Sequence, residues 1–134
     1  MLDYNDFIHI KVADFFKEKE KEYFVYLYFT YCPHCNAIKE EVLEFIQAHP
    51  NYKFYLINMD GDKDSQLFKD IENDDNLSRN VFIKQYVSDS IGESELKNVG
   101  YYYVPSLYEI YDHKIKNVFV TEIPIKGLLN ELKK

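Results

Sequence analysis

The sequence has no tryptophan and is poor in cysteine, glycine, proline and arginine: its 134 residues include two Cys, four Gly, four Pro and one arginine, Arg79. Two cysteines cannot form a disulfide framework, and few Gly and Pro together with 17% aromatic residues argue against a disordered chain. The longest apolar run, Tyr23–Tyr31, is about half the length that a membrane span needs. We therefore expect one globular domain over residues 1–134 and no membrane span.

The charge balance is acidic, because 16 Lys and Arg face 23 Asp and Glu and leave a net charge of −7. Binding to nucleic acid depends on clustered basic side chains, so we expect no nucleic-acid partner. Much of the excess negative charge lies in Asp60–Asp75. The first six residues have neither the basic nor the apolar part of a secretory signal. The chain as written is expected in the cytoplasm, and outside it only if a leader has been removed.

Hydrophobic periodicity predicts helices and strands in alternation. In chain order we expect an opening helix from Ile8 to the charge run Lys17–Glu22, a strand at Tyr23–Tyr31, a helix at Pro33–His49, a strand at Tyr52–Met59, helices near Ser65–Glu72 and Asn80–Ser90, a hairpin of Val104–Tyr111 and Ile115–Thr121, and a last helix around Pro124. A short strand at Phe7–Ile10 is the alternative to the opening helix. The run Tyr23–Tyr31 lacks polar alternation, which is typical of a central strand that is covered on both faces.

Both cysteines lie in Tyr31-Cys32-Pro33-His34-Cys35, where this strand passes into the next helix. The unpaired N–H groups and the positive dipole end of a helix start favour a thiolate at Cys32. Cys35 follows within one turn, close enough to attack a mixed disulfide on Cys32 and release the partner. A protonated His34 would add positive charge beside the thiolate and make the disulfide more oxidising. Pro33 suits the first helical position, where its missing N–H costs nothing.

Two plainer roles for the cysteine pair are a zinc site and a structural disulfide. A structural zinc site needs four ligands at defined spacings, but the chain has no second cysteine pair and its other histidines, His9, His49 and His113, are scattered. A disulfide that closes so short a loop would constrain the unfolded chain little. We therefore expect a reactive dithiol and no metal.

The sequence resembles the thioredoxin superfamily over most of its length. The shared layout is a strand leading into Cys-X-X-Cys at a helix start, a second strand, an X-Pro at the head of a hairpin and a terminal helix. The resemblance implies an α/β thioredoxin-like fold, with a central mixed β-sheet flanked by helices. Residues 61–99, approximately, form a small helical insert before the cis-proline hairpin in this comparison.

The resemblance also implies functional residues beyond the cysteines. Pro105 matches the family's cis proline, which faces the dithiol, and Val104 matches the residue whose backbone pairs with an extended substrate. Tyr31, directly before Cys32, belongs to the expected substrate-binding set. The run Tyr101–Tyr103 lies just before the proline, where packing in the core is favoured over a place in a substrate groove.

The dipeptide Pro33-His34 resembles the active site of the bacterial disulfide-forming (Dsb-type) oxidases, and Val104 before the proline does so too. Thioredoxins have Gly-Pro and glutaredoxins Pro-Tyr between the cysteines. The reduction potentials of thioredoxin and the Dsb oxidase differ by about 150 mV. One position departs from the family: Tyr26 stands where these proteins keep a buried carboxylate. Deprotonation of Cys35 is then expected to depend on water or on another group.

The sequence therefore predicts a monomeric thiol–disulfide oxidoreductase that acts on protein or peptide thiols and disulfides together with an unidentified redox partner. It is expected to lean toward oxidation and to need no cofactor besides the Cys32–Cys35 disulfide. One alternative is a non-catalytic thioredoxin-like accessory module, for example in peptide export, that holds a client beside Pro105. The other is a glutaredoxin-like reductase, although the Gly-Gly turn that binds glutathione in those proteins is missing.

Overall fold

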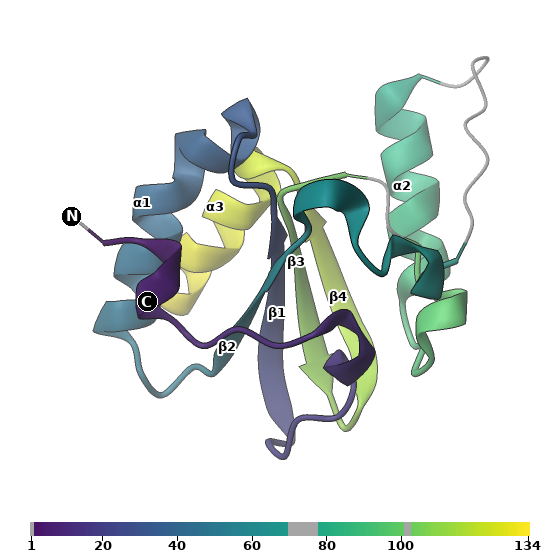
Figure 1. The fold of residues 1–134 in the computed structure, drawn as a ribbon, viewed down its shortest axis with the longest axis horizontal. Coiled ribbons are helices and arrows are strands. Elements are labelled where there is room, and N and C mark those ends of the chain that lie inside the picture. Colours follow the sequence, from purple (N-terminus) through teal and green to yellow (C-terminus); the bar gives the residue numbers. More distant parts are fainter. Residues whose placement is uncertain (1, 70–77, 101–102) are drawn as a thin grey trace.

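The computed structural model describes residues 2–69, 78–100 and 103–134, and it shows a four-stranded sheet between helices (Figure 1). The helices and strands are β1 (Glu22–Tyr28), α1 (Pro33–Ala48), β2 (Phe54–Asn58), α2 (Arg79–Ser90), β3 (Ser106–Tyr111), β4 (Lys114–Val120) and α3 (Glu122–Leu132). The strand order is β2-β1-β3-β4, with β1 parallel to β2 and the other two pairs antiparallel. The predicted α/β fold with a central mixed sheet is confirmed.

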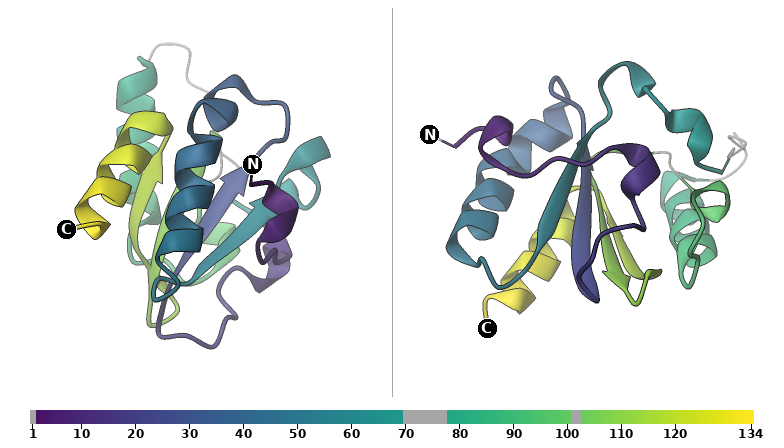
Figure 2. Two further views of the ribbon diagram at one scale, coloured as in Figure 1. Left: turned by 90° about the vertical axis from the view of Figure 1, so that its left-hand side faces the viewer. Right: turned by 60° about the horizontal axis from the view of Figure 1, so that its bottom comes forward.

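Strand β1 is central, and every residue after Glu22 in it is buried, which explains its continuous apolar sequence. Its side chains alternate between the two faces of the sheet, with Phe24, Tyr26 and Tyr28 on one and Tyr23, Val25 and Leu27 on the other. The first face packs against α1 and α3, which lie side by side in Figure 2. We call it the α1/α3 face, and we call the opposite one the α2 face.

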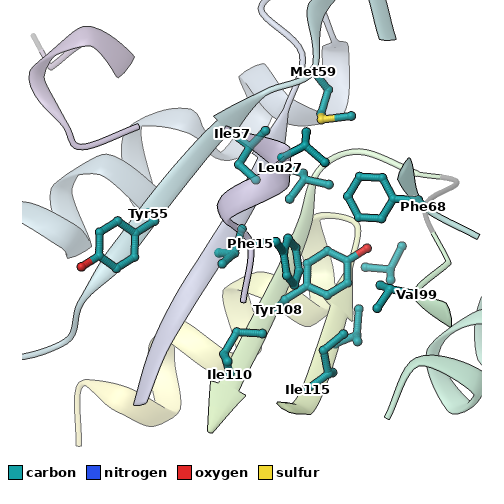
Figure 3. Packing of buried hydrophobic residues seen from close by; sticks show 14 of the residues in the cluster. Phe15, Leu27, Tyr55, Ile57, Met59, Phe68, Val99, Tyr108, Ile110 and Ile115 are labelled. Atoms are coloured by element: carbon teal, nitrogen blue, oxygen red, sulfur yellow. The ribbon is translucent and has the colours of Figure 1, made fainter. Parts of the chain in front are cut away.

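The α2 face is covered by helix α2 and by a group of aromatic side chains (Figures 1 and 3). The ring of Phe15 meets the rings of Tyr108 and Phe68 edge to face, at centroid distances of 5.0 and 6.0 Å. Helix α2 begins after Ser78, whose hydroxyl accepts a hydrogen bond from the Val81 N–H at 3.3 Å. Helix α2, which lies between β2 and β3 in the chain, thus covers the face opposite to α1 and α3. The sheet is therefore the middle of three layers.

The predicted opening helix is wrong. Two single 3₁₀ turns, Tyr4–Asp6 and Val12–Asp14, flank an extended segment that runs beside β2. The Ile10 N–H donates to the Leu56 carbonyl at 3.0 Å, and the Leu56 N–H donates to the Ile8 carbonyl at 2.9 Å. The outer edge of β2 would otherwise leave these backbone groups unpaired, so edge pairing prevails over the helical spacing of the apolar residues.

The predicted helix near Ser65–Glu72 is also wrong over its described part. Only a single 3₁₀ turn forms there, at Ser65–Leu67, and the residues from 70 to 77 lie outside the described part of the chain. The predicted helix at Asn80–Ser90 is present as α2. Within the described residues, no helix is both long and apolar enough to cross a membrane.

Candidate active site

The loop from Phe29 to Cys32 leads from the end of β1 to the start of α1, and an acidic side chain after β2 holds it. Asp60 accepts hydrogen bonds from the Thr30 N–H at 2.8 Å and from the Thr30 hydroxyl at 2.5 Å. These two donors lower the pKa of the Asp60 carboxyl below its ordinary value. Because parallel strands end at the same edge, β2 brings Asp60 to the loop that precedes the dithiol.

Cys32 is the N-cap of α1, and Pro33 is the first helical residue. The Cys35 N–H donates to the Cys32 sulfur at 3.2 Å, so this sulfur takes the place that a serine or aspartate oxygen has in an ordinary cap. Both cysteines are free thiols, with Cys32 8% exposed and Cys35 fully buried. An incoming sulfur can therefore reach Cys32 and not Cys35.

The substrate residues expected from the sequence lie beside Cys32. The Val104–Pro105 peptide bond is cis, and the Cys32 thiol points toward the Val104 carbonyl, with 3.9 Å between sulfur and oxygen. Pro105 lies directly before β3, and its carbonyl accepts a hydrogen bond from the N–H of Thr121, directly after β4, at 2.9 Å. Val104 is only half-buried. A loop 72 residues further along the chain thus forms one wall of the dithiol site.

The two thiols differ in their surroundings. Burial is the main cause that raises the pKa of Cys35 to about 12; the hydrogen bond with Cys32 contributes to this rise, while the backbone of Phe29 opposes it. Cys35 is therefore protonated at neutral pH while both thiols are free. Exposure makes Cys32 the outer sulfur and Cys35 the inner one.

The side chain between the cysteines contacts α3, which the sequence did not indicate. His34 Nδ1 lies 3.3 Å from Glu122 Oε1, and His34 is about half exposed. Glu122 stands in the first turn of α3, where a carboxylate interacts favourably with the helix dipole. Sequence reasoning missed both Glu122 and Asp60, because each comes to the site from a different element.

Two further expectations concern aromatic residues near the site. Tyr31 is 92% exposed directly before Cys32, so its ring is available to a partner. In the run Tyr101–Tyr103, residues 101 and 102 lie outside the described part of the chain, while Tyr103 receives the guanidinium of Arg79 over its ring at 5.0 Å. The described residues contain no group of three or more His, Cys, Asp or Glu that could hold a metal ion.

The buried cluster that contains both cysteines also contains two tyrosine hydroxyls that have no hydrogen-bond partner among the described residues. They belong to Tyr26 of β1 and to Tyr4 of the first 3₁₀ turn. Burial is the main cause that raises the pKa of both phenols well above the ordinary value, and Cys35 adds to each shift. Both hydroxyls therefore stay neutral at any physiological pH.

Comparison with solved structures shows that the chain has the thioredoxin fold. It is similar to mitochondrial thioredoxin 3 of Saccharomyces cerevisiae in its oxidized form, with a TM-score of 0.57 and 14% identity over 97% of this chain and 96% of that one. It is similar to the thioredoxin of Plasmodium falciparum, with a TM-score of 0.56 and 12% identity over 93% and 97% of the two chains. For thioredoxin f2 of Chlamydomonas reinhardtii the values are 0.54 and 11%, over 95% and 96%.

No protein-family model and no curated protein sequence matches the chain. The similarity to thioredoxins is therefore found by comparing structures, at sequence identities of 11–14% for the three proteins named above. A thioredoxin fold with a Cys-X-X-Cys pair at the start of α1 supports a thiol–disulfide oxidoreductase as the general class.

Proposed function

We propose that this protein exchanges disulfides with protein or peptide thiols through Cys32 and Cys35, mainly in the oxidising direction. The observation that carries the proposal is the asymmetry of the two sulfurs at the start of α1. Cys32 reaches the surface beside Val104, whereas Cys35 is fully buried behind it and is protonated at neutral pH. An outer sulfur that forms the mixed disulfide and an inner one that closes the ring are what exchange requires.

In the oxidising direction the reaction begins with the Cys32–Cys35 disulfide. A client thiolate attacks the Cys32 sulfur, the Cys32–Cys35 bond breaks, and Cys35 leaves as a thiolate and takes up a proton. A second thiolate of the client then attacks the client sulfur that is bonded to Cys32. This step forms the disulfide of the client and releases Cys32 as a thiolate. The client loses two electrons to the protein, and a disulfide of a redox partner must accept them to restore the starting state.

The oxidising direction is supported by the groups around Cys32. The N-terminus of α1 stabilises a thiolate at this position, and a stabilised reduced form makes the disulfide a stronger oxidant. The exposed ring of Tyr31 and the half-buried Val104 provide an apolar surface next to the sulfur. A peptide segment that carries the client thiol would bind there.

The exchange is tested with a reduced two-thiol client peptide and the oxidised protein. Wild type is expected to convert the peptide thiols to a disulfide, and Cys32→Ser to lose this activity by at least a hundredfold. In cells, full activity of Cys32→Ser would instead support a binding module without redox chemistry. The far-UV circular dichroism of both proteins serves as the control for folding.

The direction is tested by equilibrating the protein with glutathione buffers and measuring the fraction of reduced dithiol. We expect a potential less negative than the value of about −270 mV typical of thioredoxin. A value at or below that figure would contradict the oxidising direction and leave the exchange activity intact.

A further inference from the structure

The α1/α3 face contains two buried hydroxyls that make no hydrogen bond within the described chain. Tyr26 is fully buried and Tyr4 is 5% exposed, and neither phenol oxygen has a partner. A buried hydroxyl without a partner destabilises a folded protein, because it has lost its hydrogen bonds to water. Phenylalanine, which the chain uses ten times, would fill the same space without that loss.

Both hydroxyls belong to the aromatic cluster on which the dithiol rests. The Tyr4 ring stacks on the Tyr28 ring at 3.7 Å between centroids, and the Tyr26 ring lies parallel to Tyr28 at 6.2 Å. Cys32 and Cys35 are buried in the same cluster. Tyr4, Tyr26 and the inner cysteine thus share one buried cluster, and the charge of Cys35 adds to the larger effect of burial in raising the pKa of both phenols.

The third tyrosine of this cluster is already engaged. The hydroxyl of Tyr28 lies 2.7 Å from Nε2 of His9, at the outer side of the sheet. Among these three tyrosines, only Tyr4 and Tyr26 therefore have a free O–H to offer to a new acceptor.

We propose that the Tyr26 and Tyr4 hydroxyls donate hydrogen bonds to the Cys35 thiolate that forms during disulfide exchange. The inference deepens the proposed function and rests on it. When a client attacks Cys32, Cys35 leaves with a negative charge in a position that water does not reach. A buried charge needs donors, and a hydrogen bond to an ionised group is stronger than one between neutral groups.

The phenols act as donors and not as acids. Because their own pKa values lie far above the ordinary one, they keep their protons when the Cys35 thiolate forms. In the reverse reaction Cys35 loses its proton, attacks the mixed disulfide at Cys32, and the leaving client thiolate takes up one proton. Protons and electrons balance without a change at either tyrosine, and the hydroxyls lower the barrier equally in both directions.

The experiment follows both steps with an aromatic disulfide, 5,5′-dithiobis(2-nitrobenzoic acid), added to the reduced protein. The first coloured thiolate is released when Cys32 attacks, and the second when Cys35 resolves the mixed disulfide. We expect Tyr26→Phe to slow the second release about tenfold, Tyr4→Phe to slow it less, and the double variant to slow it most. The rate of the first release should stay within about twofold of the wild-type rate in all three variants. The pH at which the rate of the second release is half-maximal should rise by about one unit.

Tyr23→Phe is the matched control, because Tyr23 is a fully buried tyrosine of the same strand whose hydroxyl donates to the Phe15 carbonyl on the opposite face. It should lower the melting temperature and leave the second release unchanged, whereas Tyr26→Phe should leave the melting temperature equal or higher. Second-release rates and pH midpoints equal to wild type in both Tyr26→Phe and Tyr4→Phe would overturn the inference alone. A wild type that releases no second thiolate would overturn the proposed function, and this inference with it.

Discussion

The two faces of the sheet differ in the hydrogen bonding of their buried tyrosine hydroxyls. On the α2 face, Tyr23 and Tyr108 donate to backbone carbonyls, and Tyr86 shares a hydrogen bond with Tyr108. On the α1/α3 face, Tyr4 and Tyr26 have no partner in the described chain. The first arrangement is typical of a core built for stability, since buried polar groups are normally paired. The unpaired hydroxyls belong to the cluster that contains the dithiol, and by our proposal they form hydrogen bonds only when Cys35 becomes a thiolate.

The largest effect is expected from removing the sulfur that the α1/α3 face surrounds. Cys35→Ser should leave the attack of Cys32 on an aromatic disulfide intact and reduce the second release by at least a hundredfold, because a serine hydroxyl does not resolve a mixed disulfide. Mass spectrometry should then show the protein carrying the aromatic thiol on Cys32. A normal second release would mean that Cys35 is not the resolving group.

A smaller effect, on stability alone, is expected from the α2 face. Tyr108→Phe removes the buried hydrogen bonds that this hydroxyl makes with the Tyr86 hydroxyl and with the Gly100 carbonyl, so urea unfolding should show a loss of about 1–3 kcal/mol. Both releases from the aromatic disulfide should keep their rates. If Tyr108→Phe slowed the second release as much as Tyr26→Phe, the distinction between the two faces would not hold.

The smallest effect is expected at the loop that leads to the dithiol. The Asp60 carboxyl has a pKa below its ordinary value of 3.8, because Thr30 donates to it. A group whose pKa is lowered by folding stabilises the protein above the unfolded pKa, and this contribution disappears as the pH falls through the folded pKa. Asp60→Asn should therefore be slightly less stable than wild type at pH 7.

Urea unfolding at neutral and at acidic pH tests the direction of this pH dependence. The difference between Asp60→Asn and wild type should shrink as the pH falls from neutral through the lowered pKa of the folded protein, because the carboxyl of wild type then becomes protonated as well. A difference that stayed constant, or grew, on acidification would contradict the assigned cause. Thr30→Val is the matched variant, since it removes the hydroxyl donor and keeps the backbone N–H.

Local patterns in the sequence predicted those parts of the fold that depend on neighbouring residues. The apolar run into Cys32, the proline at the helix start and the amphipathic spacing after it predict β1, α1 and the place of the dithiol. The prediction of an opening helix was wrong for a physical reason: an apolar residue at helical spacing, such as Ile8, also suits an extended edge segment. Pairing with β2 decided between the two.

The residues of the site also divide into those that the sequence predicts and those that only the structure reveals. Cys32 and Cys35 were evident from the sequence because they lie within one helical turn of each other, and Val104 and Pro105 were expected through the family resemblance. The partners that come from other elements were not. Glu122 beside His34 was not foreseen, because the contact joins residues 88 positions apart and depends on how α3 packs beside α1.

The sequence by itself determined that one reactive turn follows a buried central strand, because helix capping, proline placement and hydrophobic runs act over a few residues. Only the tertiary structure decided which sulfur faces the surface and what surrounds the other. Tyr4 meets Tyr28 through the packing of the first 3₁₀ turn on the sheet, a contact that no local pattern contains. The unpaired hydroxyls beside Cys35 exist only once the chain has folded, because burial is what removes their partners in water.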